Sequence, residues 1–528
     1  MEVIMQTRRE FLRNTSLAVT SLSAISILSA GCAENLASRS SKDKGPNIIF
    51  IQCDQLNAKA LSCYGGEVNT PNIDRLAKEG VRFTNAACVV PFCSPSRATW
   101  VTGMYPHAHG IVANVPYPEK PGPAKRGAQH GITDDDIITE KILNRSGYAT
   151  SHSGKWHLTG VPSCYPEMYR TQTEYPDEME PVFAKVRKTD PDKWMDWYKW
   201  KLPVTVSDAV KENSKNLKLG IYHDFIAKIG KLELPVEQNW DVRACDKAVE
   251  KIKASKGRPF MITCSFNAPH DPNVVPSPYY DMFDPDKITL AENRGVREKR
   301  FEKDWSRHIV DALKEPGLRE FMRIYYAMVK LIDDQVGRIL KTLEKTGRLD
   351  NTVIIFTADH GDMMSGHGMV WKSTKAFYDE IVRVPMIIRY PKMFRPQTCD
   401  MAVDSTDFMP TILALTGKTI PKQAQGQNLL PYLTGKKSQS KARQYTFSER
   451  VNRHRKGLRE VAPGTKASFC VRGRGFKYCK YPNQEYLYDL KNDPGEEKTI
   501  VNDPAYKDRL EIMRTELTKW LKRTKWTG

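Results

Sequence analysis

The chain of 528 residues lacks several features that indicate particular classes of protein. Behind the N-terminal segment it has no apolar run of the length that a membrane-spanning helix needs. It has no CxxC pair, which argues against a zinc site, and no internal repeat. Its net charge of +19 favours an anionic partner, but no nucleic-acid-binding motif accompanies that charge. We therefore expect an anionic ligand and no nucleic acid among its partners.

The N-terminus predicts export. Residues 1–32 are typical of a twin-arginine signal peptide, in which paired arginines precede an uncharged, mostly apolar stretch. The stretch ends at Cys32 in a sequence similar to a bacterial lipoprotein cleavage box, although Ser29 stands where that box usually has leucine. We expect a periplasmic or cell-surface protein with a candidate lipid anchor at Cys32 and a polar linker over residues 33–45.

The chain has eleven cysteines, a number that suggests disulfides in an exported protein. Cys32 is the candidate for lipidation, and Cys93 lies in a motif that predicts chemistry. Eleven minus these two leaves nine, an odd number, so at least one cysteine is expected to stay unpaired.

Four short apolar runs predict the strands of a parallel sheet. The runs cover residues 47–52, 148–152, 259–266 and 352–357. Helical patterns alternate with them, for example at residues 70–78, 242–253 and 321–344. This alternation predicts an α/β fold with a large, mostly parallel sheet sandwiched by helices. Because ligands bind at the carboxyl ends of such strands, the polar residues that follow the four runs are expected to converge.

The segment PFCSPSR, residues 91–97, precedes a helical pattern over residues 98–102. Ser94 suits the N-cap of that helix and Pro95 suits its first position. Cys93 is therefore expected just before a helix N-terminus, where free N–H groups and the helix dipole favour an anion.

This segment resembles the Cys-x-Pro-Ser-Arg signature of the formylglycine-dependent sulfatases, which belong to the alkaline-phosphatase-like superfamily. The resemblance extends from about residue 46 to about residue 519. It implies that a formylglycine-generating maturase oxidises Cys93 to an aldehyde, which hydrates to a geminal diol. One hydroxyl then attacks sulfur, and the second expels sulfate and regenerates the aldehyde. The resemblance also implies that Arg97 stabilises the aldehyde hydrate.

The resemblance further implies one divalent metal ion. Asp54 and Asp359 supply hard oxygen ligands. The family pattern adds His360 and the modified Cys93, and it places Gln55 nearby.

Many sulfatases instead have a second aspartate before Asp54 and an asparagine after Asp359. The Asp-Gln and Asp-His variants are similar to those of phosphonate monoester hydrolases and choline sulfatases. Carboxylates favour Ca²⁺, whereas a coordinating imidazole leaves manganese and zinc open.

The family pattern assigns sulfate binding and proton transfer to residues on separate loops. Lys155, in the segment GKWH, and Lys372 are expected to hold sulfate. His157 is expected to contact the diol and to act as the base in sulfate release. His270, in the segment APHDP, is expected to contact sulfate and to protonate the leaving oxygen. His367 either contacts substrate or stabilises its loop.

We expect a catalytic domain over residues 46–435 and a smaller C-terminal domain over residues 444–528. The second is predicted to contain an antiparallel sheet and a packed helix, with strands at residues 468–472, 476–481 and 486–490 and a helix at residues 504–521. Residues 161–240, rich in Trp, Tyr, Lys and Asp, fit the family pattern least. They either help to shape the substrate pocket or form a plain helical insertion.

The leading hypothesis is hydrolysis of a sulfate ester on a sulfated carbohydrate. Two alternatives stay open: a phosphonate or phosphate ester hydrolase with the same nucleophile, and a non-catalytic glycan-binding protein that retains the fold. The complete set of Cys93, Arg97, Lys155, His157 and His270 argues against the binding protein, because binding alone does not require it.

Overall fold

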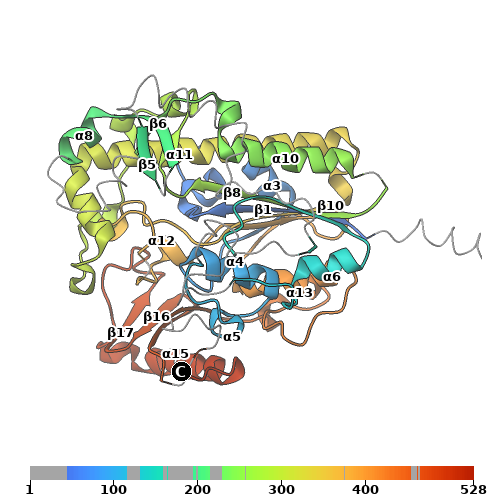
Figure 1. Ribbon diagram of the computed structural model, residues 1–528. Coiled ribbons are helices and arrows are strands. Elements are labelled where there is room, and N and C mark those ends of the chain that lie inside the picture. Colours follow the sequence, from blue (N-terminus) through green and yellow to red (C-terminus); the bar gives the residue numbers. More distant parts are fainter. Residues whose placement is uncertain are drawn as a thin grey trace, which may run out of the picture. The chain divides into compact units, whose positions relative to one another are not determined.

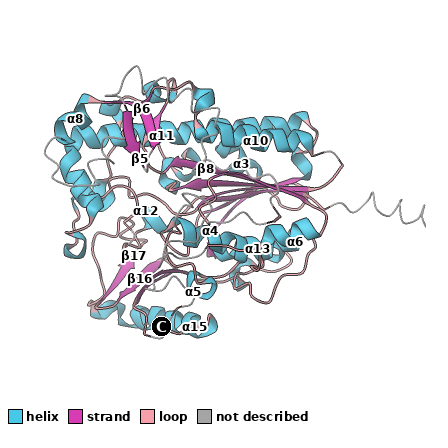
Figure 2. Cartoon of the chain, viewed as in Figure 1, coloured by secondary structure: helices cyan, strands magenta, loops and turns pink. Residues whose placement is uncertain are grey.

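The four apolar runs form adjacent parallel strands on one side of a seven-stranded sheet (Figures 1 and 2). In sheet order they are β4 (Ala149–Gly154), β8 (Phe260–Pro269), β1 (Asn47–Asp54) and β10 (Thr352–Ala358). Every residue of β1 is buried, which explains why its sequence is an uninterrupted apolar run.

Three more strands extend the sheet beyond β10. They are β11 (Met386–Arg389), β2 (Val81–Phe83) and β12 (Gln397–Cys399). Because β11 runs antiparallel to both of its neighbours, the sheet is mixed but mostly parallel. The predicted fold class is confirmed.

This computed structural model describes residues 45–115, 131–158, 163–164, 194–197, 200–214, 229–255, 257–373, 375–452, 461 and 464–528. The predicted signal peptide, Cys32 and most of the predicted polar linker therefore lie outside the described residues. Much of the predicted insertion over residues 161–240 lies outside them as well. Within the described part of the chain, no helix has both the length and the apolar character that a membrane crossing needs.

Helices cover both faces of the sheet (Figure 2). One face carries α3 (Pro71–Glu79), α10 (Trp240–Ala254) and α11 (Trp305–Lys345). The other carries α4 (Cys93–Thr102), α6 (Thr139–Arg145) and α13 (Phe408–Leu415).

Helix α11 begins well before the predicted start at residue 321. Its axis is kinked at Lys314, two residues before Pro316, and the helix continues on both sides of the kink. Proline lacks an N–H group and normally ends a helical pattern, which hides the first segment of α11 in the sequence.

Among the described residues before the C-terminal sheet, two small sheets and four short α-helices accompany the large sheet and the helices that cover it. One sheet pairs β3 (Ala86–Ala87) with β13 (Val403–Asp404); the other contains β5 (Trp194–Trp197), β6 (Trp200–Val206), β7 (Gly230–Leu232) and β9 (Val274–Val275). The helices are α5 (Pro106–His109), α8 (Asp208–Ser214), α12 (Asp379–Val382) and α14 (Leu430–Leu433). Because β5, β6 and β7 fall within residues 161–240, the described part of that stretch is not a plain helical insertion.

The C-terminal sheet is antiparallel. Its strands, in order, are β14 (Thr446–Val451), β15 (Ala467–Gly473), β16 (Phe476–Tyr481) and β17 (Gln484–Asp489), and α15 (Lys507–Arg523) packs against it. β14 is an unpredicted strand with a charged residue, Glu449, near its middle. Glu449 is nevertheless fully buried and accepts hydrogen bonds from the backbone N of His107 (2.7 Å) and from its Nδ1 (2.6 Å). His107, which is far away in the sequence, thus stabilises the buried charge of Glu449. A charged residue at this position is otherwise typical of a surface linker, so the sequence does not indicate β14.

Each of the ten cysteines in the described residues is a free thiol. The suggestion of disulfides from the cysteine count is therefore wrong for this part of the chain. Most of these thiols lie in the apolar core, where cysteine packs as a small hydrophobic side chain.

The contact of α15 with its sheet gives a prediction about stability. Trp520 is buried and stacks on Phe447, with ring centroids 5.0 Å apart. Trp520→Ala is expected to lower the free energy of unfolding by about 3–5 kcal/mol, because it leaves a large cavity. Ile512→Ala, on the exposed side of the same helix, should change it by no more than about 0.5 kcal/mol. Urea unfolding measures both; equal effects would contradict this packing.

Candidate active site

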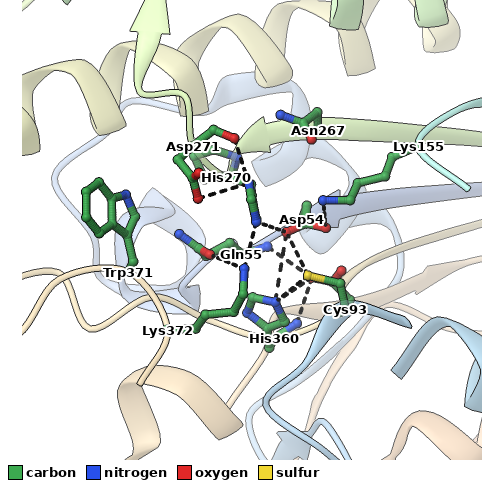
Figure 3. Close-up of polar contacts among 12 residues, drawn as sticks. Asp54, Gln55, Cys93, Lys155, Asn267, His270, Asp271, His360, Trp371 and Lys372 are labelled. Atoms are coloured by element: carbon green, nitrogen blue, oxygen red, sulfur yellow. Dashed lines mark hydrogen bonds and ion pairs between the residues drawn. The ribbon is translucent and has the colours of Figure 1, made fainter. Parts of the chain in front are cut away.

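The carboxyl ends of the four parallel strands bring several predicted site residues together, among them Asp54, Lys155, His270 and His360 (Figure 3). Asp54 is the last residue of β1, and Asp359 and His360 directly follow β10. Lys155 follows β4, and His270 follows β8. The convergence expected from the sequence is thus present in the structure.

Helix α4 begins at Cys93 itself. Its N-cap is Phe92, whose backbone is extended (φ −152°, ψ 136°), so the prediction of Ser94 as N-cap is wrong. The Ser94 hydroxyl instead donates to the carbonyl oxygen of His157 (2.7 Å) and accepts from the N–H of Val115 (3.1 Å). These two bonds tie α4 to neighbouring loops and leave Cys93 in the first helical turn, where the dipole favours negative charge.

Four buried side chains could together hold one metal ion. The ligand atoms of Asp54, Cys93, Asp359 and His360 all lie within 4.8 Å of one another. Sγ of Cys93 is 3.3 Å from Nε2 of His360 and 3.7 Å from Oδ1 of Asp54. Nδ1 of His360 is 2.9 Å from the carbonyl oxygen of Gly361, so Nδ1 carries the proton and Nε2 keeps its lone pair. Two carboxylates and a correctly oriented imidazole fit a divalent cation.

One guanidinium holds both carboxylates. Nε of Arg97 donates to Oδ2 of Asp359 (2.9 Å), and Nη2 donates to Oδ2 of Asp54 (3.0 Å). Nη1 donates to Oγ of Ser265 (2.9 Å) and to the carbonyl oxygen of Lys155 (2.8 Å). Arg97 engages the Oδ2 atoms, whereas Oδ1 of Asp359 accepts from the backbone N–H groups of Gln55 (3.0 Å) and His360 (2.9 Å). Oδ1 of Asp54 faces Sγ of Cys93. Its predicted role at the aldehyde hydrate stays a prediction.

The two carboxyl groups have opposite pKa shifts. Burial raises the pKa of Asp54, but the charges of Lys155 and Arg97 outweigh burial and bring it well below its usual range. Nζ of Lys155 lies 2.7 Å from Oδ2 of Asp54. Burial and the charge of Asp54 raise the pKa of Asp359 to about 7. A bound cation therefore has to displace a proton from Asp359 at lower pH.

Lys372 and His270 form a hydrogen-bonded pair beside this group (Figure 3). Nδ1 of His270 is 2.6 Å from the carbonyl oxygen of Asp271 and 3.1 Å from its carboxylate, so Nδ1 carries the proton. Nε2 then accepts from Nζ of Lys372 (2.7 Å), which also donates to Oε1 of Gln55 (3.1 Å). Burial and the charges of Lys155 and Lys372 lower the pKa of His270 well below its usual range. The imidazole is therefore neutral near pH 7.

The two remaining predicted histidines differ in their surroundings. Burial and the charge of Lys155 lower the pKa of His157 well below its usual range, so this imidazole is neutral as well. His367 instead stacks on Tyr378, with ring centroids 3.6 Å apart, and its carbonyl oxygen accepts from Arg307 (3.2 Å). These contacts favour the loop-stabilising role of His367.

Three residues of the site are not among the predicted ones. Ser265 accepts from Arg97, Asp271 holds His270, and Asp362 accepts from Gln55 (2.8 Å). Only their positions in the sequence could have indicated Asp271 and Asp362. Asp271 lies one residue after His270, and Asp362 lies two residues after His360.

The family model named Sulfatase matches residues 46–418. The chain belongs to the sulfatase family. A second model, the C-terminal region of N-sulphoglucosamine sulphohydrolase, matches residues 366–523 of this sulfatase. The family makes the protein a sulfuric ester hydrolase and generally implies a metal ion and a formylglycine.

A known sulfatase is similar to this chain in sequence, and solved structures are similar to it in fold. The N-acetylglucosamine-6-O-sulfatase of Bacteroides thetaiotaomicron is 28% identical over 553 aligned residues, which cover 95% of this sulfatase and 90% of the relative. A protein solved with its substrate D-glucosamine-2-N,6-O-disulfate has a TM-score of 0.69 at 24% identity, over 91% of this chain and 98% of that one. The phosphonate monoester hydrolase of Silicibacter pomeroyi has a TM-score of 0.71 at 22% identity, over 91% and 96%. These two structures show that the fold is shared.

The raised pKa of Asp359 predicts how metal binding depends on pH. Below about 7 a proton has to leave Asp359 before its carboxylate can bind a divalent cation such as Ca²⁺. The Ca²⁺ affinity is therefore expected to rise with pH, by up to about tenfold per pH unit, and to level off above this pKa. Calorimetry in buffers of different ionisation enthalpy counts the released protons; a flat profile without proton release would contradict the shift.

Proposed function

We propose that this sulfatase hydrolyses a sulfate ester of a carbohydrate and that its nucleophile is a formylglycine formed from Cys93. The observation that carries the proposal is the burial of Cys93, two carboxylates and an imidazole within 4.8 Å at a helix N-terminus. A formylglycine supplies a geminal diol, with one hydroxyl to attack sulfur and a second that allows sulfate to leave. Because Cys93 is fully buried, the maturase has to act before folding is complete.

We assign one divalent cation to Asp54, Asp359, His360 and residue 93, and we expect Ca²⁺ because carboxylate oxygens suit it. The cation supplies Lewis acidity, which lowers the pKa of a hydroxyl and offsets negative charge on sulfate oxygens. Arg97 keeps both carboxylates in place before the cation binds. Gln55 is a pocket residue in this assignment, since its amide contacts Lys372 and Asp362.

Two lysines and two histidines complete the proposed chemistry. Lys155 and Lys372 supply positive charge for the sulfate oxygens. To protonate the leaving oxygen, His270 has to gain a proton on Nε2, the nitrogen that faces Lys372, while Asp271 holds Nδ1. His157 is neutral near pH 7 and can accept the proton of the diol during sulfate release.

A sulfated carbohydrate is the substrate class that the relatives favour. The sulfatase of Bacteroides thetaiotaomicron is named for N-acetylglucosamine, and the solved complex contains a disulfated glucosamine. A second candidate is a phosphonate monoester, because the Asp54-Gln55 and Asp359-His360 pairs and the shared fold also fit that class.

Replacing Cys93 tests the proposed nucleophile. Cys93→Ala and removal of the metal by a chelator are each expected to abolish sulfate release from a panel of sulfated amino sugars, uronates and 4-nitrophenyl sulfate. Cys399→Ala, at a buried cysteine of β12 outside the metal group, serves as the matched control and should stay active. Peptide mass spectrometry should find the aldehyde at residue 93 in active protein.

Two outcomes of this experiment speak against the proposal. Sulfate release by Cys93→Ala, or by protein with an unmodified Cys93, would contradict the nucleophile. Faster turnover of 4-nitrophenyl phenylphosphonate than of every sulfate ester in the panel would favour the second candidate.

We also propose that the protein is exported to the periplasm or the cell surface. The paired Arg8 and Arg9 and the box that ends at Cys32 support this proposal. Replacing both arginines with lysine is expected to keep the protein in the cytoplasm, and Cys32→Ala to prevent incorporation of labelled palmitate. Export of the double-lysine variant at the normal level would contradict a twin-arginine signal.

A further inference from the structure

The loop that leads to Lys372 has a strained backbone. Four residues other than glycine have a positive φ in residues 364–371, namely Met364 (45°), Ser365 (72°), His367 (52°) and Trp371 (56°). L-amino acids rarely adopt this conformation, and it persists only where the surrounding structure enforces it. This strained loop directly precedes Lys372, a proposed sulfate-binding residue, so contacts with other residues must stabilise the loop conformation.

One oxygen of Asp362 closes this loop at both ends. Oδ1 accepts hydrogen bonds from the N–H groups of Met364 (2.8 Å) and Trp371 (3.1 Å). The N–H of Met363 also donates to the carbonyl oxygen of Trp371 (2.9 Å). Since Asp362 is fully buried, water does not compete for these bonds. The carboxylate therefore fixes the point from which the side chain of Lys372 extends.

The other oxygen of Asp362 orients the side chain of Gln55. Oδ2 accepts from Nε2 of Gln55 (2.8 Å), and Oε1 of Gln55 accepts from Nζ of Lys372 (3.1 Å). A carboxylate can only accept, and an ammonium can only donate. The amide of Gln55 thus has a single orientation that satisfies both neighbours.

We propose that Asp362 is a positioning residue for Lys372. Through Gln55 and the closed loop, it holds the ammonium between Oε1 of Gln55 and Nε2 of His270 (Figure 3). The ammonium then needs little rearrangement when an anion arrives, which favours binding. This inference rests on the proposed role of Lys372 in sulfate binding, and it adds a residue that supports that role without touching substrate.

The variant Asp362→Asn tests the inference with little change in size. Its single amide oxygen can still accept from the loop, but its NH₂ group then faces Nε2 of Gln55. To avoid two opposed donors, Gln55 has to flip, which turns its own NH₂ group toward Lys372. We expect the dissociation constant of inorganic sulfate to rise, and kcat/KM to fall, by about 10- to 100-fold, the usual effect of removing a supporting hydrogen-bond partner.

Asp333→Asn is the matched control. Asp333 is also fully buried and accepts from two backbone N–H groups, those of Asn72 (3.0 Å) and Ile73 (2.9 Å), and from the side-chain amide of Asn72 (3.0 Å). These bonds join α11 to α3, so the control should lower the unfolding temperature without changing the affinity for sulfate.

A double-mutant cycle separates positioning from a merely structural role. Calorimetry at constant ionic strength measures sulfate binding to the wild type, Asp362→Asn, Lys372→Ala and the double variant. If Asp362 acts through Lys372, Asp362→Asn should weaken binding by no more than about twofold in the Lys372→Ala background. An equal loss in both backgrounds would overturn the inference.

A second variant keeps the test decisive if Asp362→Asn does not fold. Gln55→Leu breaks the link to Lys372 and leaves the loop closed by Asp362, so it should weaken sulfate binding only while Lys372 is present. Unchanged sulfate affinity in Gln55→Leu would overturn the inference. A wild type that binds no sulfate and releases none from any ester would instead contradict the proposed function, so the two failures are distinguishable.

Discussion

Two aspartates at the ends of neighbouring strands have to stay close together inside this protein although their charges repel. Arg97 makes this arrangement stable, because it donates one hydrogen bond to Asp54 and one to Asp359. Arg97 belongs to α4, whose first residue is Cys93, so the same contact fixes the distance between the cysteine and the carboxylates. The positions of the metal ligands, the nucleophile and the strand ends therefore depend on one another, so a shift of one displaces the others.

The C-terminal sheet contacts the segment that follows Lys372 and so stabilises the active site. Lys477, on β16, is buried and donates to Glu496 (2.8 Å) and to the carbonyl oxygen of Phe377 (2.9 Å), and it pairs with Asp379 (2.5 Å). Phe377 and Asp379 follow closely on Lys372 in the chain. Because a buried charge is costly when it loses its partner, these contacts resist separation of the sheet from the active-site loop.

Structural features that follow from local sequence patterns are predictable from the sequence. Features that depend on contacts between residues far apart in the sequence are not. The four parallel strands were predictable because strands buried on both faces form continuous apolar runs, and their ends place Asp54, Asp359 and His270 together. The cap of α4 was mispredicted because Ser94 bonds to other loops, which local helix rules do not consider. The role of Asp362 was missed because its partner Gln55 lies on another strand end, far away in sequence.

The most direct test of the account is a crystal structure of the mature, Ca²⁺-loaded protein with sulfate bound. The account predicts one metal ion in contact with Oδ1 of Asp54, a carboxylate oxygen of Asp359, Nε2 of His360 and the hydrated aldehyde at residue 93. It predicts sulfate in contact with the ammonium groups of Lys155 and Lys372. A metal ion bound elsewhere, or an unmodified Cys93 with sulfate outside this group, would contradict it.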